Sequence, residues 1–268
     1  MKHSKPLVTC VISTRGFAPT IDNCLKSIRN QSYKNVEIVI VTEKGAPDTI
    51  ITANKYKATI IIEGVERSVK RNIGIQRASG DYVLILDDDL ELDTNVINDC
   101  LEKISKCDFI SIPELPFGID FRAKCHRFEK MAYVDGFTPV EGARFFPRKL
   151  VLLVGGYDPS LVGAEDWDLT QRLLEKGYRL GRVKSKVNHN DGKYDFLKTI
   201  KKKFYYGRVY GEYSKRHPKA FVQTIFRFQV LKNIKHILKH PALFIGSILF
   251  RLVEGMAVLL GAVLSIKL

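Results

Sequence analysis

The chain has 268 residues, of which 45% are hydrophobic and 27% charged, and its formal net charge is +14. This length is sufficient for one main domain with extensions. The five cysteines are odd in number and show no C-x-x-C spacing, which indicates neither a zinc ribbon nor a disulfide framework and makes the cytosol the default location. No N-terminal signal is expected, because the apolar run at residues 6–12 is short and passes into a polar loop.

Apolar segments of strand length alternate with segments of helical periodicity along most of the chain. Helices are predicted from Thr20, over about residues 66–78, and over residues 95–105. Strands are predicted at residues 7–13, 36–42, 59–62, 82–86 and 108–112. This alternation predicts an α/β fold with a mostly parallel sheet flanked by helices.

Three carboxylates, Asp87, Asp88 and Asp89, directly follow the apolar strand at residues 82–86. A buried strand would deliver them to the C-terminal edge of the sheet, where open α/β folds bind their ligands. Because three adjacent like charges repel one another, the triplet indicates a bound cation, and hard oxygen ligands favour Mg²⁺ or Mn²⁺. The alternative is a solvated acidic turn.

A second acidic group, Glu165, Asp166 and Asp168, opens a predicted helix that ends at Gly177. Carboxylates at a helix N-terminus are ordinary partners of the helix dipole. We therefore expect one of the three to have a capping role.

The C-terminal part of the chain is strongly basic. Residues 193–268 hold fifteen Lys or Arg against three Asp or Glu, a net charge of +12. Between residues 227 and 240 an apolar stripe lies opposite Lys232, Lys235 and Lys239. This pattern predicts a basic amphipathic helix suited to an anionic membrane surface.

Residues 242–266 are apolar apart from a few polar positions, of which Ser247, Arg251 and Glu254 share one helical face. A charge near the middle of a spanning helix costs about 2.5–3.5 kcal/mol. We therefore predict a helix in the plane of the membrane, or a shallow hairpin, with Arg251 and Glu254 pairing at i,i+3. A helix packed against the main domain or in a dimer is the alternative.

Three stretches carry a resemblance to a known family: TCVISTRG, ERSVKRNIGIQRASGDYVLILDDD and EGARFFPRKLVLLVGGYDPSLVGAEDWDLTQRL. Their content and order, between about residues 5 and 190, resemble family 2 glycosyltransferases. The resemblance implies a Rossmann-like GT-A domain over residues 1–192, inverting transfer from a nucleotide-sugar, and Mn²⁺ or Mg²⁺ as cofactor. Residues 193–268 would then form a membrane-associating helical extension.

The resemblance also implies a donor site. Asp87 matches a ribose or metal contact and Asp89 a metal–diphosphate contact, while Arg71 of the family's R-N pair could balance phosphate charge. The second strand ends in VTEKG and lacks the family's aspartate-rich turn, so Glu43 is the candidate for the base contact and the nucleotide, UDP or GDP, stays open. The remaining matches to donor-binding segments are Ser13, Thr14, Arg15, Asp88, Gly142, Ala143 and Arg144.

For catalysis, Glu165 and Asp166 match the family's E-D pair, which implies that Asp166 is the general base. His189 resembles a late histidine that joins the metal site, and a surface or packing role is its alternative. An acceptor hydroxyl needs a base whereas a phosphate does not, so the E-D pair favours a hydroxyl acceptor.

Other functions remain as alternatives. A polyprenyl-phosphate glycosyltransferase is one. A nucleotidyltransferase lacks support because no glycine-rich phosphate loop is present near the N-terminus, and a nucleic-acid-binding protein leaves both acidic groups unexplained. The expected partners are a nucleotide-sugar, a glycan or lipid-linked acceptor and an anionic membrane surface, without nucleic acid, and a homodimer is a further option. The expected location is the cytoplasmic face of the cell membrane.

Overall fold

The computed structural model describes residues 5–16, 18–43, 47–131, 134, 142–161, 163–219 and 234–265. The chain divides into two compact units. The first comprises Met1–Pro113, Glu141–Pro159 and Glu165–Asn188, and the second comprises Glu114–Val140, Ser160–Ala164 and His189–Leu268. The sequence predicted a boundary at residue 192, and the last segment of the second unit begins nearby, at His189. The sequence did not indicate that the segments 114–140 and 160–164 belong to the same unit as the C-terminal helices.

A seven-stranded sheet with the order β3-β2-β1-β4-β8-β6-β9 forms the centre of the first unit. Strands β3, β2, β1 and β4 run parallel to one another and β6 runs parallel to β9, whereas β8 runs antiparallel to β4 and β6 on either side of it. The mostly parallel sheet expected from the sequence is therefore confirmed. The strands are β1 (Val8–Ser13), β2 (Val36–Thr42), β3 (Thr59–Ile62), β4 (Tyr82–Asp87), β6 (Phe109–Ser111), β8 (Ala143–Pro147) and β9 (Leu180–Arg182).

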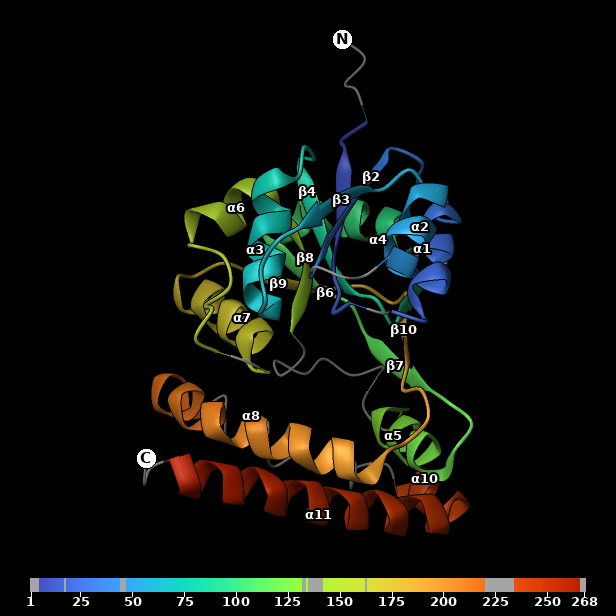
Figure 1. The fold of residues 1–268 in the computed structure, drawn as a ribbon, viewed down its shortest axis with the longest axis vertical. Coiled ribbons are helices and arrows are strands. Elements are labelled where there is room, and N and C mark those ends of the chain that lie inside the picture. Colours follow the sequence, from blue (N-terminus) through green and yellow to red (C-terminus); the bar gives the residue numbers. More distant parts are fainter. Residues whose placement is uncertain are drawn as a thin grey trace. The chain divides into compact units, whose positions relative to one another are not determined.

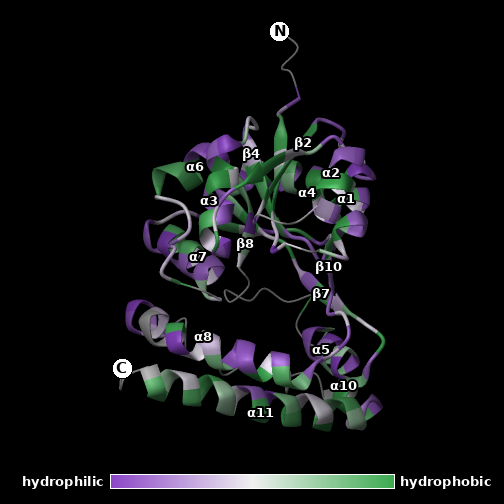
Figure 2. Cartoon of the chain, viewed as in Figure 1, coloured by the Kyte–Doolittle hydropathy of each residue, from purple (hydrophilic) through white to green (hydrophobic). Residues whose placement is uncertain are grey.

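Helices cover both faces of this sheet (Figure 1). On one face lie α1 (Ile21–Arg29), α2 (Pro47–Lys55) and α4 (Val96–Lys103), followed by the short helix η1 (Ile104–Lys106), and on the other lie α3 (Arg67–Arg77), α6 (Arg148–Leu153) and α7 (Glu165–Glu175). Alternate residues of a strand point to opposite faces. Accordingly Cys10 and Ile12 of β1 join the core under α1, whereas Val11 joins the core under α3. Figure 2 shows the resulting apolar interior and polar helix surfaces.

Helix α3 lies unusually close to β1. At Gly74 an added Cβ would lie 2.3 Å from Cγ1 of Val11, so only glycine permits this approach. The close packing draws the first turns of α3, which carry Arg67, Lys70 and Arg71, toward the carboxyl ends of the central strands.

The second unit is largely helical. It contains α5 (Phe121–Met131), α8 (Phe196–Arg216), α10 (Ile234–Lys239) and α11 (Pro241–Ser265), together with β7 (Glu114–Phe117) and the end of β10 (Val187–Asn190). Helices α8 and α11 run side by side along their lengths (Figure 1). Of the amphipathic helix predicted over residues 227–240, α10 covers the last part, and residues 227–233 lie outside the described residues.

The polar residues of α11 pair with other helices of the second unit. We expected Arg251 and Glu254 to pair with each other. The structure pairs Arg251 with Glu129 of α5, and Glu254 Oε1 with Arg122 Nη2 at 2.7 Å. Lys203 of α8 also contacts Glu254, with Nζ 2.9 Å from Oε2. Burial alone would raise the pKa of Glu254, but the two cations outweigh it and lower that pKa.

We predict that Gly207→Ala destabilises the packing of α8 on α11. A Cβ at this position would lie 2.0 Å from the backbone oxygen of Val258, and overpacking of this kind costs about 1–3 kcal/mol. Hydrogen exchange of the α8 and α11 amides should therefore become faster.

Gly255→Ala on α11 is the matched control, because an added Cβ there meets nothing within 4 Å. This control should be neutral or stabilising, since alanine favours a helix over glycine by about 1 kcal/mol. Equal exchange in the two variants would contradict the close approach of α8 and α11.

Candidate active site

The carboxyl ends of three adjacent parallel strands bring the predicted donor residues together. Ser13 at the end of β1 lies in register with Asp87 at the end of β4, and its Oγ donates to Asp87 Oδ1 at 3.4 Å. Strand β2 ends beside them, where Thr14 N–H donates to the Val41 carbonyl at 3.1 Å. The edge of the sheet predicted from the sequence is thus the place where these side chains meet.

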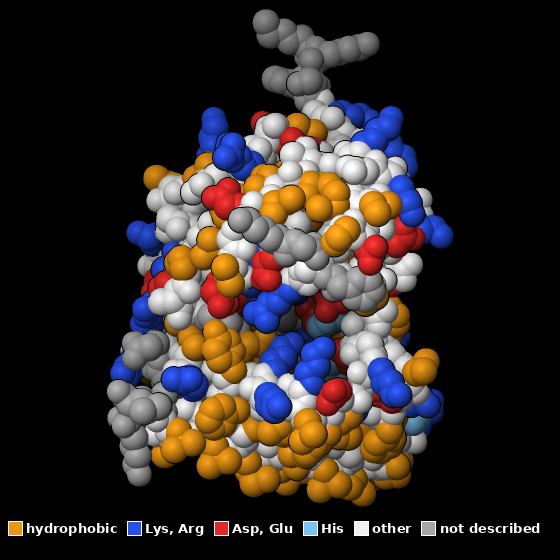
Figure 3. Space-filling model, viewed as in Figure 1, with side chains coloured by type: hydrophobic (Ala, Val, Ile, Leu, Met, Phe, Trp, Pro, Cys, Tyr) orange, Lys and Arg blue, Asp and Glu red, His pale blue; other side chains and the backbone are white. Residues whose placement is uncertain are grey.

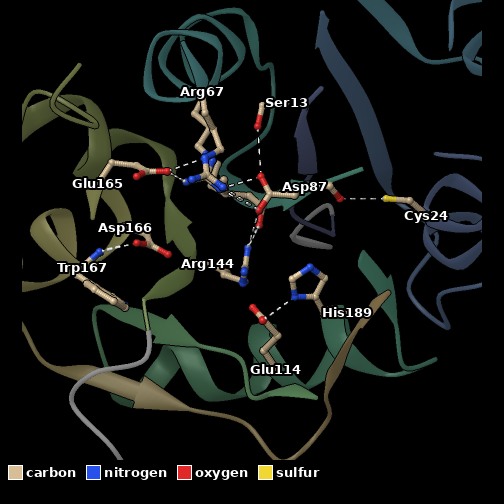
Figure 4. A network of polar contacts seen from close by, with 12 residues as sticks. Ser13, Cys24, Arg67, Asp87, Glu114, Arg144, Glu165, Asp166, Trp167 and His189 are labelled. Atoms are coloured by element: carbon tan, nitrogen blue, oxygen red, sulfur yellow. Dashed lines mark hydrogen bonds and ion pairs between the residues drawn. The ribbon is translucent and has the colours of Figure 1, made fainter. Parts of the chain in front are cut away.

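Asp87 is surrounded by arginines (Figure 4). Arg71 Nη2 donates to its Oδ1 at 2.8 Å and to its Oδ2 at 3.1 Å. Arg67 and Arg144 stand farther off, with Nη1 atoms 3.9 and 4.0 Å from Oδ2. Burial by itself would raise the pKa of Asp87, but Arg71, Arg67 and Arg144 together hold it well below its usual range. Asp87 is therefore a permanently ionised member of an ion-pair network.

Glu165 closes this network from the start of α7. Its Oε1 accepts from Arg67 Nε at 2.7 Å and from Arg71 Nη1 at 3.2 Å (Figure 4). The side chains of Arg71 and Glu165 are each only 2% exposed. Arg71 thus bridges β4 to α7 from within the protein.

The sequence offered Arg71 as a residue that could balance the charge of a donor phosphate, and that role stays a prediction. In the structure its guanidinium is buried between two protein carboxylates and lies 5.2 Å from the ring centre of Tyr157. The reason is the close packing of α3 on β1 at Gly74, which places the Arg71 side chain beneath the sheet edge and away from solvent.

Glu43 and Arg15 lie at the same edge. Lys70, itself only 1% exposed, donates through Nζ to Glu43 Oε1 at 2.9 Å and to the Thr14 carbonyl at 2.7 Å. The Glu43 side chain stays 36% exposed, which leaves it accessible to a ligand. Arg15 is 68% exposed and lies 3.9 Å from Glu66.

Asp88 and Asp89 follow Asp87 beyond the end of β4. Burial, followed by the charges of Asp89 and Asp87, raises the pKa of Asp88 to about 6. Such mutual repulsion is what a bound cation relieves. Among the described residues, no group of three or more His, Cys, Asp or Glu side chains is placed to hold a metal ion. Two adjacent carboxylates fit Mg²⁺ or Mn²⁺, because such ions are commonly held by one or two carboxylates together with substrate phosphates and water.

His189 belongs to the second unit. Its Nδ1 lies 2.9 Å from Glu114 Oε1, and its side chain is 28% exposed. A contact of this kind fixes the orientation of an imidazole ring. The predicted metal-ligand role of His189 stays a prediction.

The three acids in the first turn of α7 have separate environments. Asp168 is buried and its Oδ2 accepts from Arg172 Nε at 2.7 Å, while Arg172 also donates to the carbonyls of Val154 and Gly156 at 2.8 and 2.5 Å. Asp168 therefore anchors the preceding turn to α7, and the capping role expected for one of the three acids stays a prediction. Glu165 belongs to the arginine network, and Asp166 is only partly buried.

Asp166 has the environment of a base. Burial, followed by the charge of Glu165, raises its pKa, while Arg71, Arg144 and Arg67 oppose this rise. Its Oδ1 accepts from the backbone N–H of Trp167 at 2.9 Å (Figure 4). A carboxylate with a raised pKa is a better proton acceptor than an ordinary one.

The segment Gly142–Arg144 packs on Asp166. We expected a loop here, but Ala143 begins β8, because Ala143, Phe145 and Phe146 are buried in the sheet. At Gly142 an added Cβ would lie 2.8 Å from Asp166 Oδ2, so the backbone itself touches the carboxylate. The Ala143 N–H donates to Thr170 Oγ1 at 2.9 Å, which ties β8 to α7.

Sequence reasoning missed the part of Arg67 in this site and the contact between Asn72 and Tyr157. Arg67 stands one helical turn before Arg71, and this i,i+4 spacing was the available signal. Asn72 and Tyr157 exchange two hydrogen bonds of 2.8 Å, a pairing of distant segments that no local pattern indicates. The turn at Gly156 has φ +68°, and an added Cβ there would lie 2.4 Å from Asn72 Oδ1.

The fold is shared with solved glycosyltransferase structures. A mannosyltransferase from Pyrobaculum calidifontis, solved with GDP-Man and Mn²⁺, matches with a TM-score of 0.65 at 16% identity, over 98% of this chain and 88% of that one. The S. aureus protein TarS, solved with UDP-GlcNAc, matches with a TM-score of 0.58 at 14% identity, over 90% of this chain and 79% of that one. The GT-A fold is therefore confirmed.

Sequence relatives agree with this fold. An uncharacterized glycosyltransferase, YwdF, of Bacillus subtilis is 26% identical over 192 residues, which is 66% of this chain and 70% of the relative. The UDP-Glc:alpha-D-GlcNAc-diphosphoundecaprenol beta-1,3-glucosyltransferase WfaP of Escherichia coli is 33% identical over 98 residues, which is 34% of this chain and 39% of that protein. The model of the family "Glycosyl transferase family 2" matches residues 9–156, more than half of the chain. The chain is a glycosyltransferase and belongs to glycosyl transferase family 2.

Proposed function

We propose that this enzyme is an inverting, metal-dependent glycosyltransferase that transfers the sugar of a UDP- or GDP-sugar donor to an acceptor hydroxyl. The observation that carries the proposal is that the acidic residues of the site differ in their ion pairing and exposure. Asp87 and Glu165 are neutralised by buried arginines, whereas Asp166 is partly exposed with a raised pKa. One carboxylate is thus left to act on an acceptor.

The donor would bind at the ends of β1, β2 and β4. Ser13, Thr14, Arg15 and Glu43 surround the position of the nucleoside, with Glu43 as the candidate for the base contact. Asp88 and Asp89 would hold Mn²⁺ or Mg²⁺, which stabilises the negative charge that develops on the leaving diphosphate. The solved neighbours that contain GDP-Man with Mn²⁺ and UDP-GlcNAc support this donor class.

Transfer would take place beside Asp166. The acceptor oxygen attacks C1 of the donor sugar from the face opposite the diphosphate, and its proton passes to the Asp166 carboxylate as the C1–O bond to the diphosphate breaks. One displacement inverts the anomeric centre. Gly142, Ala143 and Arg144 would line the sugar next to this base, while Arg71 and Glu165 position it from within the protein.

The acceptor is proposed to be lipid-linked. Relatives from Escherichia coli and Campylobacter jejuni carry names that specify diphosphoundecaprenol and PP-undecaprenol acceptors. Helix α11, at Pro241–Leu264, is also long and apolar enough by composition to cross a membrane. These observations support a site of action at the cytoplasmic face of the cell membrane, with the second unit as the membrane-associating part.

Asp89→Ala is expected to abolish metal-dependent donor binding without unfolding the protein, because Asp89 follows the end of β4 and lies outside the core. Calorimetry with UDP and GDP, each with and without Mn²⁺, measures this. Asp99→Ala on α4, which removes a distant carboxylate, is the control. Unchanged Mn²⁺-dependent affinity in Asp89→Ala would remove this residue from the metal site.

Asp166→Asn is expected to retain donor binding and lose most transfer, because the amide is nearly isosteric but cannot take the proton. The loss should be about 10²–10⁴-fold, the usual contribution of a general base. Trp167 is the single tryptophan of the chain, and its backbone N–H contacts Asp166, so its fluorescence can report donor binding in the same samples. Normal transfer by this variant would refute the base assignment.

The pH dependence of transfer should respond in opposite directions to two substitutions near Asp166. Transfer requires ionised Asp166, so it falls as the pH drops through the raised pKa of this group. Glu165→Gln removes a neighbouring negative charge, which lowers that pKa and moves the acidic limb of the kcat profile to lower pH. Arg67→Gln removes a positive charge and moves the limb to higher pH.

A merely structural effect of these two substitutions would lower kcat at every pH without moving the limb. Shifts in the same direction, or none, would contradict the assignment of the limb to Asp166. Product analysis by NMR completes the test of function, since retention of the anomeric configuration would exclude the single displacement.

A further inference from the structure

Helix α11 has its large apolar side chains on the outside. Its buried positions are small or polar: Gly246, Ser247, Glu254, Ala257 and Gly261. Its exposed large apolar residues are Ile245, Ile248, Leu249, Leu252, Met256, Leu259, Leu260, Val263 and Leu264, each between 41% and 65% exposed. A helix at the surface of a water-soluble protein has the opposite arrangement, with its apolar stripe facing the core.

The inner face of α11 is fully used within the second unit. Glycines allow its backbone to approach α8 closely, since an added Cβ at Gly261 would lie 2.0 Å from the Phe204 carbonyl oxygen. Ser247 Oγ donates to the Cys125 carbonyl at 3.0 Å, and Arg251 pairs with Glu129. Small residues and polar contacts of this kind are typical of helix packing in a lipid environment.

A continuous exposed apolar face of this kind marks a surface that binds another protein or a membrane. At 1.5 Å per residue, the 25 residues of α11 extend over roughly 37 Å. Figure 3 shows hydrophobic side chains gathered over α11, with Lys and Arg side chains beside them over α8. The exposed cations of α8 and the residues after it are Lys198, Lys201, Lys202, Arg208, Lys215, Arg216 and Lys219.

We propose that α11 lies in the plane of one leaflet of an anionic phospholipid bilayer, with its outer apolar face in the acyl region and the exposed cations of α8 at the headgroups. The charge complementarity between this cationic helix and acidic lipid selects a bilayer over another protein as the partner. This inference rests on the proposed action at a membrane and specifies how the enzyme is seated there.

The packing of α8 on α11 argues against a spanning orientation. Because the two helices pack side by side with close contacts at Gly207–Val258 and Gly261–Phe204, α8 would have to enter the bilayer together with α11. Lys201 and Lys202 are exposed and would then lie in hydrocarbon, which is costly for charged side chains. In the plane of the leaflet the same lysines reach phosphate groups.

Flotation of the full chain with lipid vesicles tests whether the surface formed by α8 and α11 binds a membrane. Vesicles of phosphatidylcholine with about one-third phosphatidylglycerol should carry the protein at 0.1 M salt, conditions under which surface charge acts over about 10 Å. Leu252→Asp/Leu259→Asp should lower binding at least about tenfold. Leu153→Asp on α6 is the matched control, because Leu153 is 76% exposed but belongs to the first unit, and it should float normally.

The contribution of charge is tested in the same way. Lys201→Glu/Lys202→Glu should lower binding to anionic vesicles about tenfold or more. Lys149→Glu/Lys176→Glu changes the net charge equally at exposed positions of the first unit and should leave binding unchanged.

Depth measurements separate the two orientations. Three single-tryptophan variants, Ile245→Trp, Leu252→Trp and Leu259→Trp, each made in a Trp167→Phe chain, should be quenched equally by shallow-brominated lipids. Deep quenching of Leu252→Trp with shallow quenching of the other two would show a spanning helix and overturn the proposal. Absence of flotation, with light scattering that reveals a dimer broken by Leu252→Asp/Leu259→Asp, would overturn it in favour of a second copy of the chain.

The binding of α11 to the membrane and the proposed function can be tested separately. Slow hydrolysis of UDP- or GDP-sugars with Mn²⁺ should be the same in the α11 variants as in the unaltered protein. Flotation without any donor hydrolysis would uphold the membrane surface and refute the proposed metal-dependent use of UDP- or GDP-sugars, whereas hydrolysis without flotation would do the reverse.

Discussion

The candidate site depends on the buried guanidinium of Arg71. It holds Asp87 at the end of β4 and Glu165 at the start of α7, with hydrogen bonds of 2.8 and 3.2 Å. The N–H donors of a guanidinium group are fixed in one plane, so the group can bind two carboxylates on opposite sides. Replacing one member of such a buried set leaves an uncompensated charge, which costs about 3–5 kcal/mol. Strand β4, which ends at Asp87, and helix α7, which carries Asp166, are therefore held in one arrangement.

This arrangement explains why neighbouring acids differ in their chemistry. Asp87 and Glu165 form ion pairs with Arg71, and Asp168 forms one with Arg172. Asp166 is partly exposed and has a raised pKa. The backbone of Gly142 fills the space against its carboxylate. A positioned carboxylate beside a preorganised sheet edge suits the proposed transfer, because both reactants must be held at once.

The second unit uses glycine and ion pairs for a different purpose. Close contacts at Gly207 and Gly261, together with the ion pairs of Arg251 and Glu254, hold α11 against α5 and α8 and leave many of its large apolar residues exposed. The stability of this helix pair in water therefore does not come from burying that apolar face. A lipid surface would cover that face, and this would place the enzyme beside the lipid-linked acceptor proposed for it.

The sequence by itself determined the mostly parallel sheet, the edge at which Ser13, Asp87 and Glu43 gather, and the basic, apolar character of the C-terminal helices. Strand alternation and helical periodicity are local, so the sequence displays them directly. Only the tertiary structure decided that Arg71 is buried, that residues 143–147 form an antiparallel strand, and that Arg251 pairs with Glu129. These outcomes depend on how closely distant segments approach one another, and that approach is set by packing at residues such as Gly74 and Gly142, which no local pattern contains.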